Sequence, residues 1–141
     1  MSRLNGTLPE LKIDRSKAQP GPESYFVGNV HVQVVHRPAP GEGGFEVVAV
    51  FFDAGARNRP HTHTTDQLLY FVEGSGFVHV AGAEEQHAGP GTLMVVPAGV
   101  VHMHGATAKE PIVHIAMRPA GAGSRWDFDD LPDGWERWVA K

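Results

Sequence analysis

The chain has 141 residues, of which 41% are apolar, and this is enough for one domain with a core of its own. It contains no cysteine, which excludes disulfides, thiolate nucleophiles and cysteine-ligated metal centres. A formal net charge of −4, without a basic run, argues against nucleic acid as a partner.

The first segment, residues 1–20, is predicted to be a polar arm. It has no apolar leader, and no run in the chain reaches the roughly 18 apolar residues that a membrane span needs. We therefore expect a cytoplasmic protein without a membrane partner. Scattered apolar residues, Leu4, Leu8, Leu11 and Ile13, would let part of the arm form an edge strand or pack on a neighbour.

Residues 21–118 are predicted to form a β-barrel. Glycine (17) and proline (11) make up about a fifth of the chain and separate short runs of Val, Phe and Ile, a pattern typical of sandwiches and barrels. The expected strands are Tyr25–His36, Phe45–Phe52, Leu68–Val72, Phe77–Val80, Gly91–Val96, Val100–His104 and Ile112–Met117. The Glu-Gly-Ser-Gly segment at 73–76 predicts a hairpin turn.

The remaining tail, residues 119–141, is the one place where a short helix is expected. Trp135 and Trp138 would lie on one face of this helix and pack either on the barrel or on a partner. The sequence therefore predicts an all-β single domain with a short helical tail.

The chemistry-bearing stretch begins with a His-x-His pair. His61 and His63 project from the same face if the chain there is extended. Gln67 follows four residues later, where a turn can return a third donor atom to the two imidazoles.

A second group of histidines follows a Pro-x-Gly turn. His102 and His104 again share one face of a strand, and His114 lies in the next apolar strand. Burying several unpaired imidazoles is costly, whereas imidazole nitrogens suit first-row divalent metals. This pattern indicates a metal site with histidines left over for contact with a substrate.

The residues resemble the two motifs of the cupin superfamily. Gly55, His61, His63 and Gly74 match the first motif, although Gln67 stands where the family usually has glutamate. The resemblance implies a jelly-roll barrel.

The second cupin motif lies at the expected separation. Gly91, Pro97, Gly99 and His102 match it, and Ala106 replaces its asparagine. The resemblance implies as metal ligands His61, His63, Gln67 and His102.

Residues 21–118 are similar in particular to small single-domain cupins that include bacterial hydroxynitrile lyases. The similarity implies a divalent metal, with Mn²⁺ favoured and Fe²⁺, Ni²⁺ or Zn²⁺ as alternatives. It places His104 and His114 at catalytic positions. Related cupins also assemble as homo-oligomers, so we expect a dimer or tetramer.

Gln67 directs the functional hypothesis. A neutral ligand set leaves the full charge of the ion, which favours Lewis-acid chemistry on a small hydroxylated substrate such as a cyanohydrin. His104 and His114 would exchange the protons as base and acid, one of them protonated at the outset. Three alternatives stay open: a dioxygenase, a sugar or enol isomerase, and a non-catalytic ligand-binding cupin. We expect some of Phe51, Leu69, Phe71, Val96 and Met103 to form apolar walls near the metal.

Overall fold

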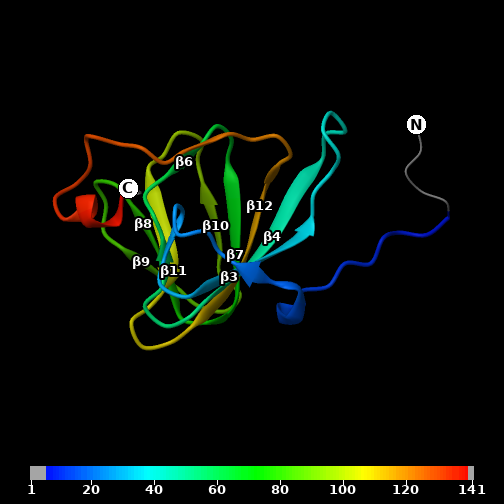
Figure 1. Ribbon diagram of the computed structural model, residues 1–141, viewed down its shortest axis with the longest axis horizontal. Coiled ribbons are helices and arrows are strands. Elements are labelled where there is room, and N and C mark those ends of the chain that lie inside the picture. Colours follow the sequence, from blue (N-terminus) through cyan, green and yellow to red (C-terminus); the bar gives the residue numbers. More distant parts are fainter. Residues whose placement is uncertain (1–5, 140–141) are drawn as a thin grey trace.

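The computed structural model describes residues 6–139, and its regular structure is almost entirely antiparallel β-sheet (Figure 1). The six-stranded sheet has the order β1 (Gln19–Pro20), β3 (Val30–His36), β4 (Phe45–Phe52), β12 (Ile112–Pro119), β7 (Gln67–Gly74) and β10 (Leu93–Val96). The five-stranded sheet has the order β2 (Phe26–Val27), β5 (Arg57–Asn58), β11 (His102–Ala106), β8 (Gly76–Val80) and β9 (Gln86–Ala88). A small ribbon pairs β13 (Ser124–Arg125) with β6 (Thr62–His63).

The core lies between the two large sheets, as the all-β jelly-roll prediction requires. Val50, Phe52 and Leu69 from one sheet pack with Val78 and Ala106 from the other in a single buried cluster. The alternation of side chains along each strand decides which residues join this cluster. His114 pairs with Val50 on β4 and with Phe71 on β7, so it faces the interior of the barrel.

The predicted hairpin around residues 73–76 is wrong. β7 pairs with β10 and β12, whereas β8 pairs with β9 and β11, so the chain crosses here from one sheet to the other. Gly74 makes the crossing possible, because its φ is +91° and a Cβ there would collide with the carbonyl oxygen of Pro111. A glycine-bearing turn between two apolar runs predicts a change of direction but not the partner of each strand.

The strand predicted over Phe45–Phe52 is present with the predicted ends, and the other predicted strands are present with altered ends. The single strand expected over 25–36 is broken at Gly28, whose φ is +88°, into β2 and β3. The strand expected over 100–104 begins only at His102 and continues to Ala106. Within the described residues, no helix is long and apolar enough to span a membrane.

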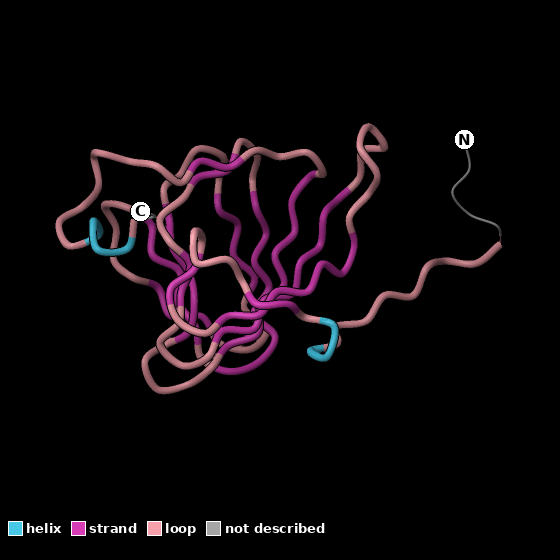
Figure 2. The backbone as a smooth tube through the Cα atoms, viewed as in Figure 1, coloured by secondary structure: helices cyan, strands magenta, loops and turns pink. Residues whose placement is uncertain are grey.

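The two ends of the chain differ in how they meet the barrel (Figure 2). The arm contains a single 3-10 turn, η1 (Arg15–Lys17), and joins the edge of β3 through β1, while Leu8 and Leu11 are exposed. The helix predicted in the tail is reduced to one 3-10 turn, η2 (Trp135–Trp138). Its tryptophans pack on the barrel, with Trp135 buried against Phe77 and Met103. Residues 1–5 of the arm, with Leu4, and residues 140–141 of the tail lie outside the described part.

Candidate metal centre

Short backbone pairings bring the four predicted ligands to one end of the barrel. His61 and His102 form an isolated antiparallel bridge, with N···O distances of 3.1 and 3.0 Å in the two directions. His63 ends β6, and Gln67 begins β7 after the turn that follows. Segments about forty residues apart in sequence thus contribute to one cluster.

The rings and the amide are close to one another and buried. The ring centroids of His61 and His102 are 4.2 Å apart, those of His61 and His63 are 4.8 Å apart, and those of His63 and His102 are 5.7 Å apart. Gln67 Oε1 lies 3.4 Å from His102 Nε2. None of the four residues is more than 7% exposed.

The rings of His61, His63 and His102 share an orientation in which Nδ1 contacts residues outside the cluster and Nε2 remains available inside it. In each ring Nδ1 has an oxygen partner outside the cluster: the Arg59 carbonyl at 2.8 Å for His61, the Val100 carbonyl at 2.9 Å for His102, and Ser124 Oγ at 2.9 Å for His63. In His61 and His102 an N–H on Nδ1 that donates to the carbonyl leaves the lone pair of Nε2 available, as in metal-bound histidines. Nδ1 of His63 also lies 2.7 Å from Arg118 Nη1, a donor, so His63 would take up this tautomer only when it binds a metal.

His63 gives the clearest sign that the cluster suits a cation. Its Nε2 is buried and has no hydrogen-bond partner among the described residues. Burial and the charge of Arg118 lower the pKa of His63 to about 3, and burial lowers the pKa of His61 and of His102. The rings are therefore neutral, which is the form that binds metal. Three imidazoles and an amide oxygen are a donor set that first-row divalent ions accept.

His104 lies beside this set and offers another grouping. Ring nitrogens of His61, His102 and His104 all lie within 4.8 Å of one another. The ring of His104, however, already has other partners: Asn58 Nδ2 lies 2.9 Å from its Nε2 and 3.2 Å from its Nδ1, and His114 Nε2 lies 2.9 Å from its Nδ1. These contacts favour a place next to the ion over a place in its ligand set.

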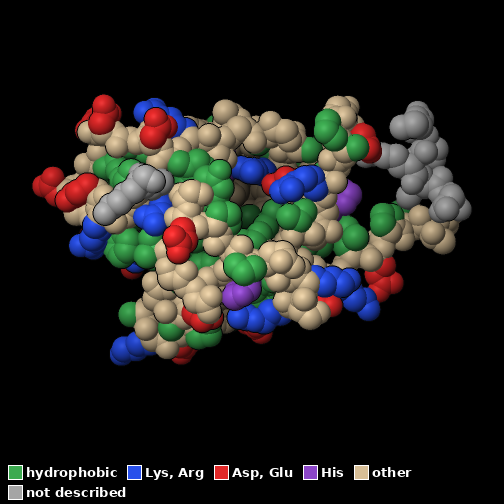
Figure 3. Space-filling model, viewed as in Figure 1, with side chains coloured by type: hydrophobic (Ala, Val, Ile, Leu, Met, Phe, Trp, Pro, Cys, Tyr) green, Lys and Arg blue, Asp and Glu red, His purple; other side chains and the backbone are tan. Residues whose placement is uncertain are grey.

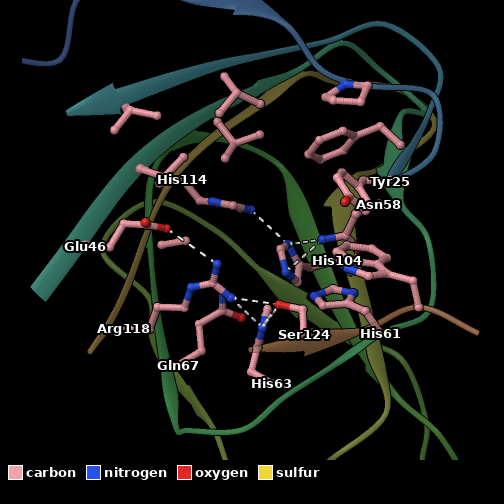
Figure 4. A pocket seen from close by; sticks show the side chains of 18 of the residues that line it. Tyr25, Glu46, Asn58, His61, His63, Gln67, His104, His114, Arg118 and Ser124 are labelled. Carbon is pink, nitrogen blue, oxygen red and sulfur yellow. Dashed lines mark hydrogen bonds and ion pairs between the residues drawn. The ribbon is translucent and has the colours of Figure 1, made fainter. Parts of the chain in front are cut away.

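His104 and His114 form a pair that spans the interior (Figure 4). His104 comes from β11 and His114 from β12, and the two are 3% and 0% exposed. The backbone N–H of His104 donates to Asn58 Oδ1 at 2.8 Å, which fixes the amide so that Nδ2 faces the ring.

The histidine pair is uncharged near neutral pH. Burial lowers the pKa of His114 to about 4. Burial, followed by the proximity of His114, lowers the pKa of His104 well below its usual value. The expectation that one of the two is protonated at the outset is therefore wrong, because each ring would have to hold its charge while almost completely buried.

A cavity of about 630 Å³ is lined by three of the predicted ligands, His61, His63 and Gln67, and by the histidine pair. The face shown in Figure 3 is hollowed near its middle. The apolar wall of the cavity includes Val32, Val34, Val48, Val50, Phe52 and Ala116. None of the five residues expected to line it does so. Phe51 and Met103 follow the strand alternation to the opposite faces of their sheets, where they pack in other clusters. Leu69, Phe71 and Val96 are buried in the core beyond the cavity.

Several polar or aromatic residues of the site escaped the sequence analysis, and four of them contact the histidines. Trp126 stacks on His61, with ring centroids 4.3 Å apart and planes at 14°, and Ser124 holds His63. Both belong to the tail, which reaches the site through the pairing of β13 with β6. Asn58 stands three residues before His61, and Arg118 shares a strand face with His114 by the two-residue alternation. This alternation from His114 to Arg118 is the one signal in the sequence that could have identified any of the four residues.

Comparison of the sequence with known proteins gives two findings. The sequence pattern of the Cupin family matches residues 18–121. An (R)-mandelonitrile lyase from Granulicella tundricola is 29% identical over 120 residues, which cover 84% of this chain and 91% of that protein.

The fold is similar to those of solved cupin structures. A cupin-like protein from Thermotoga maritima superposes with a TM-score of 0.76 at 27% identity, covering 87% of this chain and 94% of the other. The polyketide cyclase RemF from Streptomyces resistomycificus superposes with a TM-score of 0.67 at 17% identity, covering 89% of each chain.

Proposed function

The chain belongs to the cupin family, and from the site that it builds we propose that it is a metal-dependent lyase acting on a small hydroxylated substrate such as a cyanohydrin. One observation carries this proposal: an uncharged donor set and an uncharged histidine pair share one cavity. The similarity to a mandelonitrile lyase supports the same reaction class.

The donor set proposed for the ion is His61, His63, Gln67 and His102, with Mn²⁺ favoured and Fe²⁺, Ni²⁺ or Zn²⁺ as alternatives. When bound, a divalent ion supplies positive charge that lowers the pKa of the substrate hydroxyl. Gln67 leaves this charge undiminished, whereas a glutamate would offset part of it.

His104 is the proposed base. Its ring lies 5.5 Å from that of His61 and 5.4 Å from that of His102, centroid to centroid, so it is the member of the pair nearer to the donor set. The neutral ring of His104 accepts the hydroxyl proton. The bond between the hydroxyl-bearing carbon and the nitrile carbon then breaks, and the electron pair of that bond leaves with cyanide. Because neither histidine starts protonated, the proton returned to cyanide is the one just removed. The 2.9 Å contact lets His114 share that proton in the meantime.

The test is cyanide release from racemic mandelonitrile by Mn²⁺-loaded protein, with a chelator-stripped sample beside it. We expect metal-dependent release, and a loss of about 10²- to 10⁴-fold in His104→Ala or His114→Ala at unchanged metal content. His87→Ala, at an exposed histidine, serves as the matched control and should retain full activity. Absence of release from protein that holds its metal would remove the lyase proposal, and oxygen uptake with a diketone would favour the dioxygenase.

We also propose that the protein forms a homodimer or a tetramer. The outer face of the six-stranded sheet exposes large apolar side chains, with Leu93 56%, Val95 58% and Tyr70 39% exposed. Covering such a face with a second copy would remove apolar surface from water. Light scattering after size exclusion tests this, and a mass of one chain would contradict it.

A further inference from the structure

The positively charged side chain of Arg118 lines the cavity, and the lyase proposal gives it no role. Arg118 lies on β12 four residues after His114, on the same face of the strand, and its side chain is 23% exposed. It lines the cavity beside His63 and Gln67 (Figure 4). A half-buried guanidinium loses much of its hydration, so it favours a negatively charged partner.

Arg118 shares its carboxylate partner, Glu46, with Arg37. Glu46 is the only carboxylate among the described residues that line the cavity, and its Oε2 lies 2.7 Å from Arg37 Nε. Its Oε1 is 3.4 Å from Arg118 Nη2, a longer contact. Two arginines and one glutamate leave one net positive charge beside neutral histidines. A divalent ion on a neutral donor set raises this to three, which attracts an anion.

Metal binding by His63 would also break one hydrogen bond of Arg118, the one that its Nη1 donates to His63 Nδ1. Its Nη1 donates to His63 Nδ1 at 2.7 Å and to Ser124 Oγ at 3.0 Å. A neutral imidazole that gives the lone pair of Nε2 to a metal carries its hydrogen on Nδ1 and cannot accept there. His63 would then donate to Ser124, and an N–H of Arg118 would become free. Among the described residues, no acceptor contacts the Nε–H of Arg118 either.

The position of Arg118 fits the end of a short substrate. The valines of β3 and β4 and Ala116 form an apolar wall along the same cavity, which runs on to the histidine pair. An apolar body would lie on this wall with its reacting hydroxyl near the donor set. A carboxylate at the other end would meet the planar fork of Arg118, whose geometry matches two carboxylate oxygens.

We propose that the substrate of this site carries a carboxylate, bound by Arg118, on a small apolar body. The inference rests on the proposed function, because it takes the reacting hydroxyl to lie at the donor set. It names Arg118 as the residue that selects acids over neutral compounds of the same shape.

Binding of two probes to the full Mn²⁺-loaded chain tests the proposal. Phenylacetate and phenylacetamide have nearly the same shape and differ in charge, and calorimetry at fixed ionic strength gives their dissociation constants. We expect phenylacetate to bind at least about tenfold more tightly. Arg118→Gln should abolish this preference and Arg118→Lys should keep part of it. Arg15→Gln should keep all of it, because Arg15 is exposed and lies outside the cavity.

Each outcome has one meaning, provided that thermal unfolding and metal content show Arg118→Gln to be intact. Equal binding of the two probes by the unmodified protein overturns the proposal. So does a preference that survives in Arg118→Gln, because the carboxylate would then bind the metal instead. Preference without cyanide release from mandelonitrile would leave the carboxylate site standing and remove the lyase, and release without preference would do the reverse.

Discussion

Lowering the pH from 7 to 5 is expected to destabilise the metal-free protein, because His114 is buried in its neutral form. Its pKa is about 4 in the folded chain, against an ordinary value of 6.5 for an exposed histidine. Between these two values the unfolded chain binds a proton that the folded chain does not. The stabilisation is therefore complete above pH 6.5 and is lost progressively as the pH falls toward 4.

The size of the effect follows from the two pKa values. At pH 5 the unfolded histidine is almost fully protonated and the folded one almost fully neutral, which corresponds to a loss of about 2 kcal/mol in the free energy of unfolding. The lowered pKa values of His61 and His104 act in the same direction. A domain of this size has a total stability of about 5–15 kcal/mol, so the loss is readily measurable.

Urea unfolding at pH 7 and pH 5, with a chelator present, measures the effect. His114→Gln keeps a polar partner for His104 but cannot titrate, so it should lose about 2 kcal/mol less than the unmodified chain over the same interval. His87→Gln, at an exposed position, should lose as much as the unmodified chain. An equal loss in His114→Gln and in the unmodified chain would refute the assignment of the effect to His114.

Three further substitutions test other parts of the site and the fold. Gln67→Glu adds a negative charge among the donors, so calorimetry should show Mn²⁺ binding about tenfold tighter or more, and cyanide release should fall. Ser124→Ala removes the oxygen to which Nδ1 of metal-bound His63 would donate, and should weaken Mn²⁺ binding about 10- to 100-fold at a nearly unchanged melting temperature. Gly74→Ala places a Cβ against the Pro111 carbonyl at positive φ, and thermal unfolding should show a loss of at least about 1 kcal/mol.

The shared face of each His-x-His pair could be predicted because it depends on local geometry, whereas the set of four metal ligands was implied by the cupin resemblance. His61 and His63 lie two residues apart in an extended segment, and so do His102 and His104. Alternation alone puts each pair on one face of the chain. The two-residue rule holds whatever the strand pairs with, so it does not require knowledge of the sheet order.

The pairing of strands could not be predicted in the same way. β7 and β8 are separated by one residue and yet belong to different sheets, because their partners are strands far along the chain. The residues that line the cavity could not be predicted for the same reason, because they too depend on how the strands pair. Phe51 and Val50 are adjacent and both apolar, and only the register of β4 against β12 sends Val50 inward.

Local sequence patterns gave no indication that the tail, residues 119–141, contributes to the site. Ser124 and Trp126 contact two of the donor histidines, although they follow the last residue matched by the family pattern, residue 121. The barrel thus supplies the proposed metal donors, and a segment outside the family pattern supplies the Ser124 oxygen beside His63 and the Trp126 ring stacked on His61. Orientation of the donors sets metal affinity, and cover over the cavity sets what can enter. Arg118 on the barrel and Ser124 and Trp126 in the tail line the cavity beside the histidines, so they are the places to look for the specificity of this site.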